Sequence, residues 1–147
     1  MRYRPYQAMD HAACLDILAS NLERYFSPRD PGLYRAFLAR PPGFYGVVEG
    51  PEQHVLACGG FCIEGPAAVL TWGMVHADYH RRGIGRFLLN ARMRRIAESP
   101  GVEKIVMNTA EPVLGFYERM GFAVVKHTPD GYSTGLDRYD LERPLRT

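Results

Sequence analysis

The sequence predicts a single mixed α/β domain, and three observations support this prediction. Short apolar runs rich in β-branched and aromatic residues, as in strands, alternate with longer segments whose apolar residues recur at helical spacing. Gly and Pro residues punctuate most of the boundaries between these segments. The chain has 147 residues, which is enough for one hydrophobic core and short for two, so we expect one domain over residues 1–147.

The first forty residues are expected to form one strand and two helices. The stretch "RYRPY" (2–6) favours a strand, and its proline confines it to a sheet edge or a strand end. Asp10 is a candidate N-cap for a helix that runs to about Phe26 with apolar residues at helical spacing. The stretch "PGLYRAFLAR" (31–40) fits a second helix, because proline suits the start of a helix and the two prolines that follow stop it.

Three strands and a long helix are expected next. The stretches "FYGVVE" (44–49) and "VLACGGFCIE" (55–64) flank the turn-like "GPEQ" and predict an antiparallel pair. A further strand, "AVLTWGMVH" (68–76), follows after a short turn. The helix within 84–98 is expected to turn its apolar residues toward the core. Four of its arginines are expected at more exposed positions: Arg86, Arg92, Arg94 and Arg95.

The last third of the chain is expected to add two strands, a short helix and a turn-rich end. "KIVMN" (104–108) predicts a buried strand, a short helix fits 112–119, and "FAVVKH" (122–127) predicts another strand. The segment 130–145 is rich in turn residues, with a final strand near 139–142. The resulting order, β-α-α-β-β-β-α-β-α-β-β, predicts a mixed sheet covered by helices.

The composition is that of a soluble globular protein. With 46% hydrophobic and 23% charged residues, the chain has no run approaching the ~20 apolar residues of a membrane span, and its start lacks a signal-peptide pattern. We therefore expect a cytoplasmic protein without a membrane partner. The formal net charge of +2 is too small to argue for nucleic acid as a partner. Cys14, Cys58 and Cys62 form neither an even set nor a paired C-x-x-C motif, so we expect no disulfide framework and no metal site.

Two closely spaced glycines lie directly before the long helix, in "HRRGIG" (80–85). Glycine allows a positive φ and a close approach to the main chain, while the first turn of a helix has unpaired N–H groups and a partial positive charge. Together with two arginines, this pattern predicts an anion site, and the expected anion is a phosphate. A dinucleotide-binding G-x-G-x-x-G is excluded because Leu88 occupies the third glycine position, and a Walker A loop because the chain has no Gly-Lys pair.

Two motifs resemble those of the GCN5-related N-acetyltransferase (GNAT) family. His80-Arg81-Arg82-Gly83-Ile84-Gly85 is similar to the family's acetyl-CoA loop, Q/R-x-x-G-x-G/A, except that histidine stands at the first position. About thirty residues later, "GFYERMGF" (115–122) resembles the family's F-Y-E-x-x-G-F signature. The resemblance implies a GNAT-like fold, with a central, mostly antiparallel sheet that splays at the acetyl-CoA site. It also implies acetyl-CoA as the acetyl donor, without a metal.

The resemblance implies roles for particular residues. Main-chain N–H groups of the loop and helix start would hold the CoA pyrophosphate, and the main chain of the preceding strand would pair with the pantetheine arm and polarise the thioester carbonyl. Tyr117 corresponds to a tyrosine that donates a proton to the departing thiolate, as the general acid. The implied cofactor-binding residues are Gly73, Met74 and Val75 in the strand and Arg81, Arg82, Gly83, Ile84, Gly85 and Arg86 in the loop and helix.

The general base and the acceptor pocket are open questions at this point. The stretch that carries a base in several family members reads "VLTWG" (69–73) here, with no titratable residue. Glu64, at the end of the previous strand, is one candidate base; His76, Glu111 and ordered water are others. The resemblance implies an acceptor pocket formed by loops around the first two helices and the last strands, and its candidate residues are Tyr25, Phe26, Tyr34, Trp72, Tyr132 and Asp137.

The expected function is acetyl-CoA-dependent transfer of an acetyl group directly to a primary amine of a small molecule or a peptide. Two alternatives stay open. One is a catalytically silent acyl-CoA-binding or regulatory module on the same scaffold. The other is a nucleic-acid binder that uses the Arg-rich helix 84–98, although exposed arginines on a helix are usually solvated. Family members often dimerise, so a homodimer is one expectation for the assembly.

Overall fold

The computed structural model describes residues 1–146, except the side chains of residues 23–25. Its seven strands form one sheet in the order β1-β2-β3-β4-β5-β7-β6. The strands are β1 (Arg2–Pro5), β2 (Phe44–Glu49), β3 (Val55–Glu64), β4 (Ala67–Val75), β5 (Lys104–Thr109), β6 (Ala123–Ser133) and β7 (Leu136–Pro144). The α-helices are α1 (His11–Tyr25), α2 (Asp30–Ala39), α3 (Ile84–Ala97) and α4 (Leu114–Arg119). Short 3-10 helices are η1 (Ala8–Asp10), η2 (Pro51–Gln53), η3 (Ala77–Tyr79) and η4 (Glu111–Val113).

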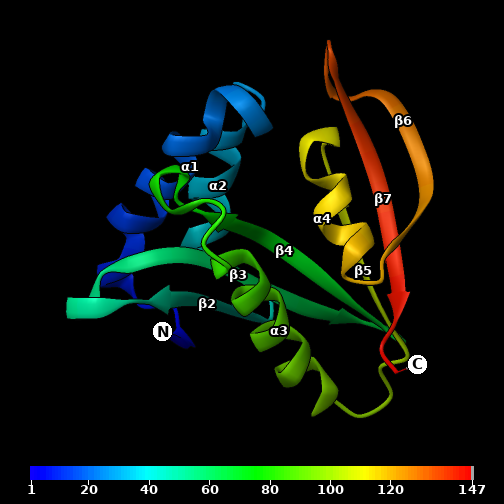
Figure 1. Ribbon diagram of the computed structural model, residues 1–147, viewed down its shortest axis with the longest axis horizontal. Helices are drawn as coiled ribbons and strands as arrows, with labels where there is room; N and C mark the ends of the chain where they lie inside the picture. The colour runs from blue at the N-terminus through cyan, green and yellow to red at the C-terminus, as the bar shows by residue number, and fades with distance from the viewer. Residues whose placement is uncertain (147) are drawn as a thin grey trace.

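The order of elements is the predicted one, and the sheet is mostly antiparallel as expected. Among the described strands only β4 and β5 run parallel, and they pair over three residues each, Ala67 to Val69 with Lys104 to Val106. Beyond these residues β5 continues against β7 alone. Figure 1 shows β4 and β5 converging near the carboxyl terminus of the chain and diverging toward their own C-terminal ends. The expected splay of the sheet is therefore confirmed.

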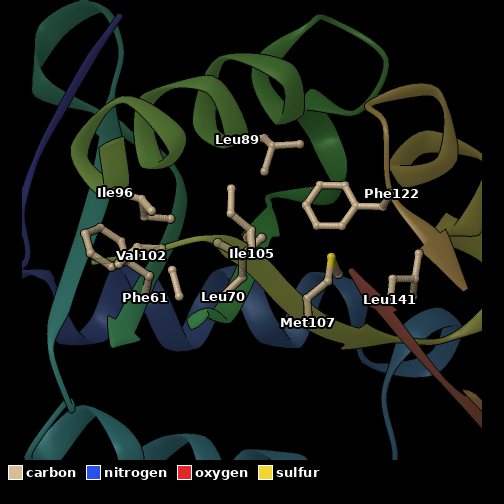
Figure 2. Close-up of a cluster of buried hydrophobic side chains, with 10 residues drawn as sticks. Phe61, Leu70, Leu89, Ile96, Val102, Ile105, Met107, Phe122 and Leu141 are labelled. Atoms are coloured by element: carbon tan, nitrogen blue, oxygen red, sulfur yellow. The ribbon is translucent and has the colours of Figure 1, made fainter. Parts of the chain in front are cut away.

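Helices pack on both faces of the sheet. On one face, α1 and α2 join a cluster with β2, β3 and β4, to which they contribute Cys14, Ile17 and Tyr34. On the other face, α3 contributes Leu89 and Ile96 to a second cluster. This second cluster draws on strands from both sides of the splay, so its burial holds the two halves of the sheet together (Figure 2). The labelled members are Phe61, Leu70, Leu89, Ile96, Val102, Ile105, Met107, Phe122 and Leu141.

A β-bulge interrupts β4 in its splayed half. Trp72 and Gly73 together lie opposite Gly59 of β3, and Trp72 has a φ of +39°, which is unusual for a bulky residue. A bulge of this kind changes the face toward which a strand points its next side chains. Leu70 therefore packs in the cluster with α3, whereas Trp72, two residues later, packs in the cluster with α1 and α2.

The expectation for the turn-rich segment 130–145 is wrong in part. The segment belongs to a long hairpin, because β6 reaches Ser133 and β7 begins at Leu136. The pairing of the two strands is irregular between Thr128 and Ser133. Proline and glycine residues lie inside this irregular stretch, where they are tolerated because regular pairing is absent. The same residues make the strand look like a loop in the sequence.

Two expectations for single side chains are also wrong. Asp10 precedes α1 as predicted, but its carboxylate does not cap the helix; it lies 2.8 Å from Arg4 and accepts the N–H of Gln7. Arg92 was expected on an exposed face of α3, yet only 2% of it is exposed. The other three arginines of that group, Arg86, Arg94 and Arg95, are exposed as expected. The basic surface of α3 is therefore smaller than the sequence suggested.

No helix in the described part of the chain is long and apolar enough to cross a membrane. The three cysteines are free thiols; two are buried and Cys62 is half-buried.

Candidate active site

The loop between β4 and α3 has the backbone conformation of an anion site. Gly83, the residue before α3, has a φ of +79°, in the left-handed region that favours glycine. Arg81 also has a positive φ, of +65°. Left-handed residues in such a loop turn N–H groups toward one point, and the first N–H groups of α3 add to them. The loop can therefore bind phosphate oxygens through its main chain, at the positive end of the helix dipole.

Arginine side chains surround this loop. Arg81, Arg82 and Arg86 are exposed, and among the described side chains none of the three forms an ion pair within 4.0 Å. Nε2 of His80 lies 2.8 Å from the carbonyl oxygen of Val75, so the histidine at the first motif position ties the loop to the end of β4. The structure therefore brings the predicted loop residues together, with three positive charges available to an anion.

Gly85 lies at the meeting point of β4, α3 and α4. A β-carbon on this residue would lie 3.6 Å from the ring of Phe116 in α4 and 3.9 Å from the side chain of Val75. Both are ordinary contact distances, so the protein's own packing does not require glycine here. The missing side chain leaves the main chain of the first helical turn accessible beside β4 and α4.

The C-terminal half of β4 has a free edge next to the loop. Pairing with β5 ends at Val69, so within the described residues the main chain of 70–75 has no strand partner on that side. Gly73 is exposed on this edge, while the side chain of Met74 is buried. The carbonyl of Val75 is already used, because it accepts a 2.9 Å hydrogen bond from Asn21. A free strand edge binds an extended, amide-bearing chain through main-chain hydrogen bonds, as the pantetheine arm would require.

Tyr117 lies on α4, on the β5 side of the splay. Its half-buried ring packs edge-on against Phe116 and Phe122, with centroid distances of 5.0 and 5.6 Å. Within the described part of the chain, its hydroxyl makes no hydrogen bond. Since Phe116 also lies against the Gly85 position, α4 holds Tyr117 one residue away from a contact with the loop helix. The geometry leaves the hydroxyl free to serve a ligand.

The candidate bases differ in how they are placed. Glu64 pairs with Ala67 at the turn between β3 and β4. Ala67 precedes Gly73 by six residues on β4, which corresponds to about 20 Å along the strand. His76 lies near the free edge, but its Nδ1 accepts the N–H of Asp78 and its Nε2 lies 3.2 Å from Asp16. The structure thus does not bring Glu64 together with the predicted acetyl site, and both nitrogens of His76 are engaged. Glu111 is exposed at the start of η4.

Aromatic residues line the bulge on the face of α1 and α2. The rings of Phe26 and Trp72 are stacked, with centroids 6.2 Å apart and an interplanar angle of 16°. Tyr34, another predicted acceptor residue, has its ring centroid 4.8 Å from that of Trp72, but its side chain is fully buried. Phe26 and Trp72 are half-buried, so this cluster can offer a partly exposed apolar wall. The side chain of Tyr25, a further predicted acceptor residue, lies outside the described residues.

Tyr132 and Asp137 are held within the β5-β7-β6 part of the sheet. The hydroxyl of Tyr132 donates to Oδ1 of Asn108 at 2.5 Å, and burial raises the pKa of this tyrosine. Asp137 accepts the N–H of Asp130 and lies 2.8 Å from Nε2 of His127. The pKa of Asp137 is lowered, mainly by the hydrogen bond from the Asp130 N–H and also by the hydrogen bond with the His127 ring. Its carboxylate therefore links β7 to β6 and stabilises the hairpin. Its role in attracting an ammonium group stays a prediction.

Two buried polar residues that the sequence did not assign to the acetyl-CoA site meet at the bulge. Tyr45 donates a 2.8 Å hydrogen bond to the carbonyl of Trp72. From the other face, the guanidinium of Arg92 lies where a β-carbon on Gly73 would come within 2.7 Å of Nη2. The burial of Arg92 could have been inferred from its position on the apolar face of α3. The hydrogen bond of Tyr45 depends on a bulge that no local sequence pattern predicts.

Among the described residues, no group of three or more His, Cys, Asp or Glu side chains is arranged to hold a metal ion.

Comparison with known proteins identifies the family of the chain. The model of the acetyltransferase (GNAT) family matches residues 12–122. The N-terminal acetyltransferase B complex catalytic subunit NAA20 of Arabidopsis thaliana is 24% identical over 143 residues, which cover 90% of this chain and 82% of that protein.

Solved structures share the fold. Ard1 from Thermoplasma volcanium superposes with a TM-score of 0.82 at 17% identity, over 99% of this chain and 98% of that one. An aminoglycoside 6'-N-acetyltransferase complexed with coenzyme A gives 0.80 at 13% identity, over 100% and 98%. The family match includes the loop, the free edge of β4 and Tyr117. The chain therefore belongs to the acetyltransferase (GNAT) family and is an N-acetyltransferase.

Proposed function

We propose that the protein transfers the acetyl group of acetyl-CoA to the free α-amine at the N-terminus of a polypeptide. The observation that supports acetyl-CoA as the donor is that two main-chain features lie next to each other. The free edge of β4, exposed at Gly73, leads into a loop whose Gly83 and Arg81 have left-handed backbones at the start of α3. The first feature suits the amides of the pantetheine arm, and the second suits the pyrophosphate.

The residues of the chain supply two parts of the chemistry. An N–H on the free edge near Gly73 or Met74 would donate to the thioester oxygen as negative charge develops on it. The neutral amine attacks the carbonyl carbon, so a C–N bond forms and the C–S bond breaks. Tyr117, as the general acid, would give its proton to the departing sulfur. The proton that the nitrogen loses passes to water or to a base.

We infer the class of acceptor from the placement of the candidate general bases, none of which is well placed. Glu64 is about 20 Å along the strand from Gly73, and both nitrogens of His76 are engaged. An α-amine has a pKa of about 7.7–8.0, so a large fraction is neutral near pH 7.5, whereas a lysine amine with a pKa of about 10.4 is almost fully charged. The third candidate, Glu111, is exposed to solvent at the start of η4. With Glu64 remote, His76 engaged and Glu111 solvated, the chain provides only a weak base, which favours an α-amine as the acceptor. The similarity to NAA20, named as a subunit of an N-terminal acetyltransferase, supports the same acceptor.

The test is release of CoA from acetyl-CoA with three sets of acceptors. The first set is a tetrapeptide library with free N-termini; the second contains the same peptides with blocked N-termini and one lysine; the third contains spermidine and kanamycin. We expect turnover with the first set alone, and kcat/KM should rise with pH to a plateau above about pH 8. Turnover with lysine, spermidine or kanamycin alone would overturn the proposed acceptor while leaving acetyl-CoA as donor intact.

A further inference from the structure

Arg92 carries a positive charge in the interior without an acidic partner. Its side chain lies under α3 and is 2% exposed. Among the described residues, no carboxylate lies within 4.0 Å of it, and its Nε has no hydrogen-bond partner. Its one recorded hydrogen bond, from Nη1 to the carbonyl of Gly60, is long at 3.4 Å. Burying an ion with so little compensation opposes folding, so stability does not explain this residue.

The guanidinium is fitted into the bulge of β4 by two glycines. A β-carbon on Gly59 would lie 3.3 Å from its Cζ, and one on Gly73 would lie 2.7 Å from Nη2 and 3.0 Å from Nη1. Any side chain at Gly73 would therefore displace the charge. Gly73 is itself exposed on the free edge of β4. The charge thus lies directly behind main chain that a bound ligand can reach.

The position of Arg92 along α3 separates it from the phosphate loop. It follows Ile84, the first residue of the helix, by eight residues, which corresponds to about 12 Å. The loop already has three exposed arginines of its own, Arg81, Arg82 and Arg86. The buried charge is therefore placed to act at the bulge, where the acyl group would lie, rather than on the pyrophosphate.

We propose that Arg92 is a positioning residue for acyl transfer. Its charge acts through the main chain of Gly73 and Met74 and makes the electrostatic potential at the free edge more positive. Negative charge that develops on the thioester oxygen is then stabilised in a region of low dielectric constant, where a fixed charge acts strongly. The hydrogen bond from Tyr45 to Trp72 holds the same bulge from the opposite face. The inference rests on the proposed donor, acetyl-CoA.

The test compares Arg92→Met, which removes the charge, with Arg92→Lys, which keeps it. Arg94→Met is the matched control, because Arg94 is an exposed arginine two residues away on the same helix. Each protein is measured for unfolding in urea, for the Kd of acetyl-CoA, for kcat with the tetrapeptide library, and for the infrared carbonyl stretch of bound acetyl-CoA labelled with ¹³C at the carbonyl. The carbonyl stretch reports the field at the thioester directly.

We expect Arg92→Met to be as stable as the wild type or more so, and to bind acetyl-CoA within about threefold. Its kcat should fall by roughly tenfold, and its carbonyl stretch should move to a higher frequency. Arg92→Lys and Arg94→Met should stay close to wild type in both readings. Should Arg92→Met fail to fold, Arg92→Gln removes the same charge and carries the same expectations.

Two results would overturn the inference, and they are distinguishable. If wild type binds acetyl-CoA and a charge-free variant keeps the wild-type kcat and carbonyl frequency, Arg92 has no role in the transfer, and the proposed function stands. If the wild type does not bind acetyl-CoA at all, the proposed function fails and the role of Arg92 fails with it.

Discussion

The hydroxyl of Tyr45 donates a 2.8 Å hydrogen bond to the main-chain carbonyl of Trp72 and so fixes the bulge of β4 from the face of α1 and α2. The same oxygen lies 2.7 Å from the hydroxyl of Tyr34. Since Tyr45 gives its proton to Trp72, Tyr34 is the donor in this second bond. Burial raises the pKa of Tyr45, which keeps its hydroxyl a donor.

Tyr45→Phe is expected to lower both stability and activity. The change leaves the Trp72 carbonyl without its side-chain donor, while the Tyr34 hydroxyl loses Tyr45 and keeps Sγ of Cys58 at 3.3 Å, so the free energy of unfolding should fall by about 1–3 kcal/mol. The freed bulge should also lower kcat. Tyr34→Phe is the matched control, because it keeps the bond to Trp72 and should lose stability with little change in kcat. Urea unfolding and steady-state kinetics measure both; equal kcat values for the two variants would count against the role of the bulge.

Tyr117→Phe tests the general acid. Removing the hydroxyl should lower kcat by about 10²-fold, because the thiolate then leaves without a positioned proton donor. The Kd of acetyl-CoA should stay within about twofold, since the ring and its packing against Phe116 and Phe122 are kept. Tyr139→Phe, a change on β7, serves as the control for loss of a tyrosine hydroxyl. Turnover by Tyr117→Phe at the wild-type rate would exclude the assigned role.

Gly83→Ala separates the strain of a positive φ from the loss of the phosphate loop. Gly83 and Gly101 have nearly equal φ values, +79° and +80°, and a β-carbon at either position would meet no atom within 4 Å. Alanine at either position should therefore destabilise the protein by a similar 1–2 kcal/mol, roughly the cost of a left-handed backbone. Only Gly83→Ala should weaken the binding of acetyl-CoA, as measured by calorimetric titration. A similar loss of affinity in both variants would mean that the loop backbone is not the binding element.

Asp10 and Arg4 should make the protein sensitive to acid. The pKa of the Asp10 carboxyl is lowered, and the main cause is its hydrogen-bonded ion pair with Arg4 at 2.8 Å. The folded pKa lies below the unfolded value of about 3.9, so the stability that Asp10 contributes is fully present above that value and is lost as the pH falls through the folded pKa. The difference in unfolding free energy between wild type and Asp10→Asn should therefore be constant above about pH 5 and shrink below pH 4. A constant difference down to pH 3 would contradict this.

Much of the fold could be predicted because its signals are local. Prolines, glycines and apolar spacing mark the ends and types of the elements, and the order they predict is the order observed. The loop at Gly83 was predictable for the same reason, since a glycine before a helix with flanking arginines already describes an anion site. The splay between β4 and β5 came only from the family resemblance, because strand pairing is a long-range property.

The remaining features depend on contacts between distant segments. The apolar spacing of α3 includes Arg92, which lies four residues from both Leu88 and Ile96, but its charge suggested an exposed side chain. Two glycines on β3 and β4 make room for it, and no single segment reveals that. The C-terminal hairpin was missed because the irregular pairing near Gly131 accepts turn residues inside a strand.

Binding of acetyl-CoA is tested by a thermal unfolding scan of the wild type with acetyl-CoA, CoA, NAD and ATP in parallel. A ligand at about 100 times its Kd adds about 2.7 kcal/mol to stability, which should raise the midpoint by several degrees. We expect such a shift with acetyl-CoA and CoA and none with NAD or ATP at the same concentration. A cooperatively folded protein that shows no shift with either CoA species, or an equal shift with ATP and NAD, would contradict this expectation.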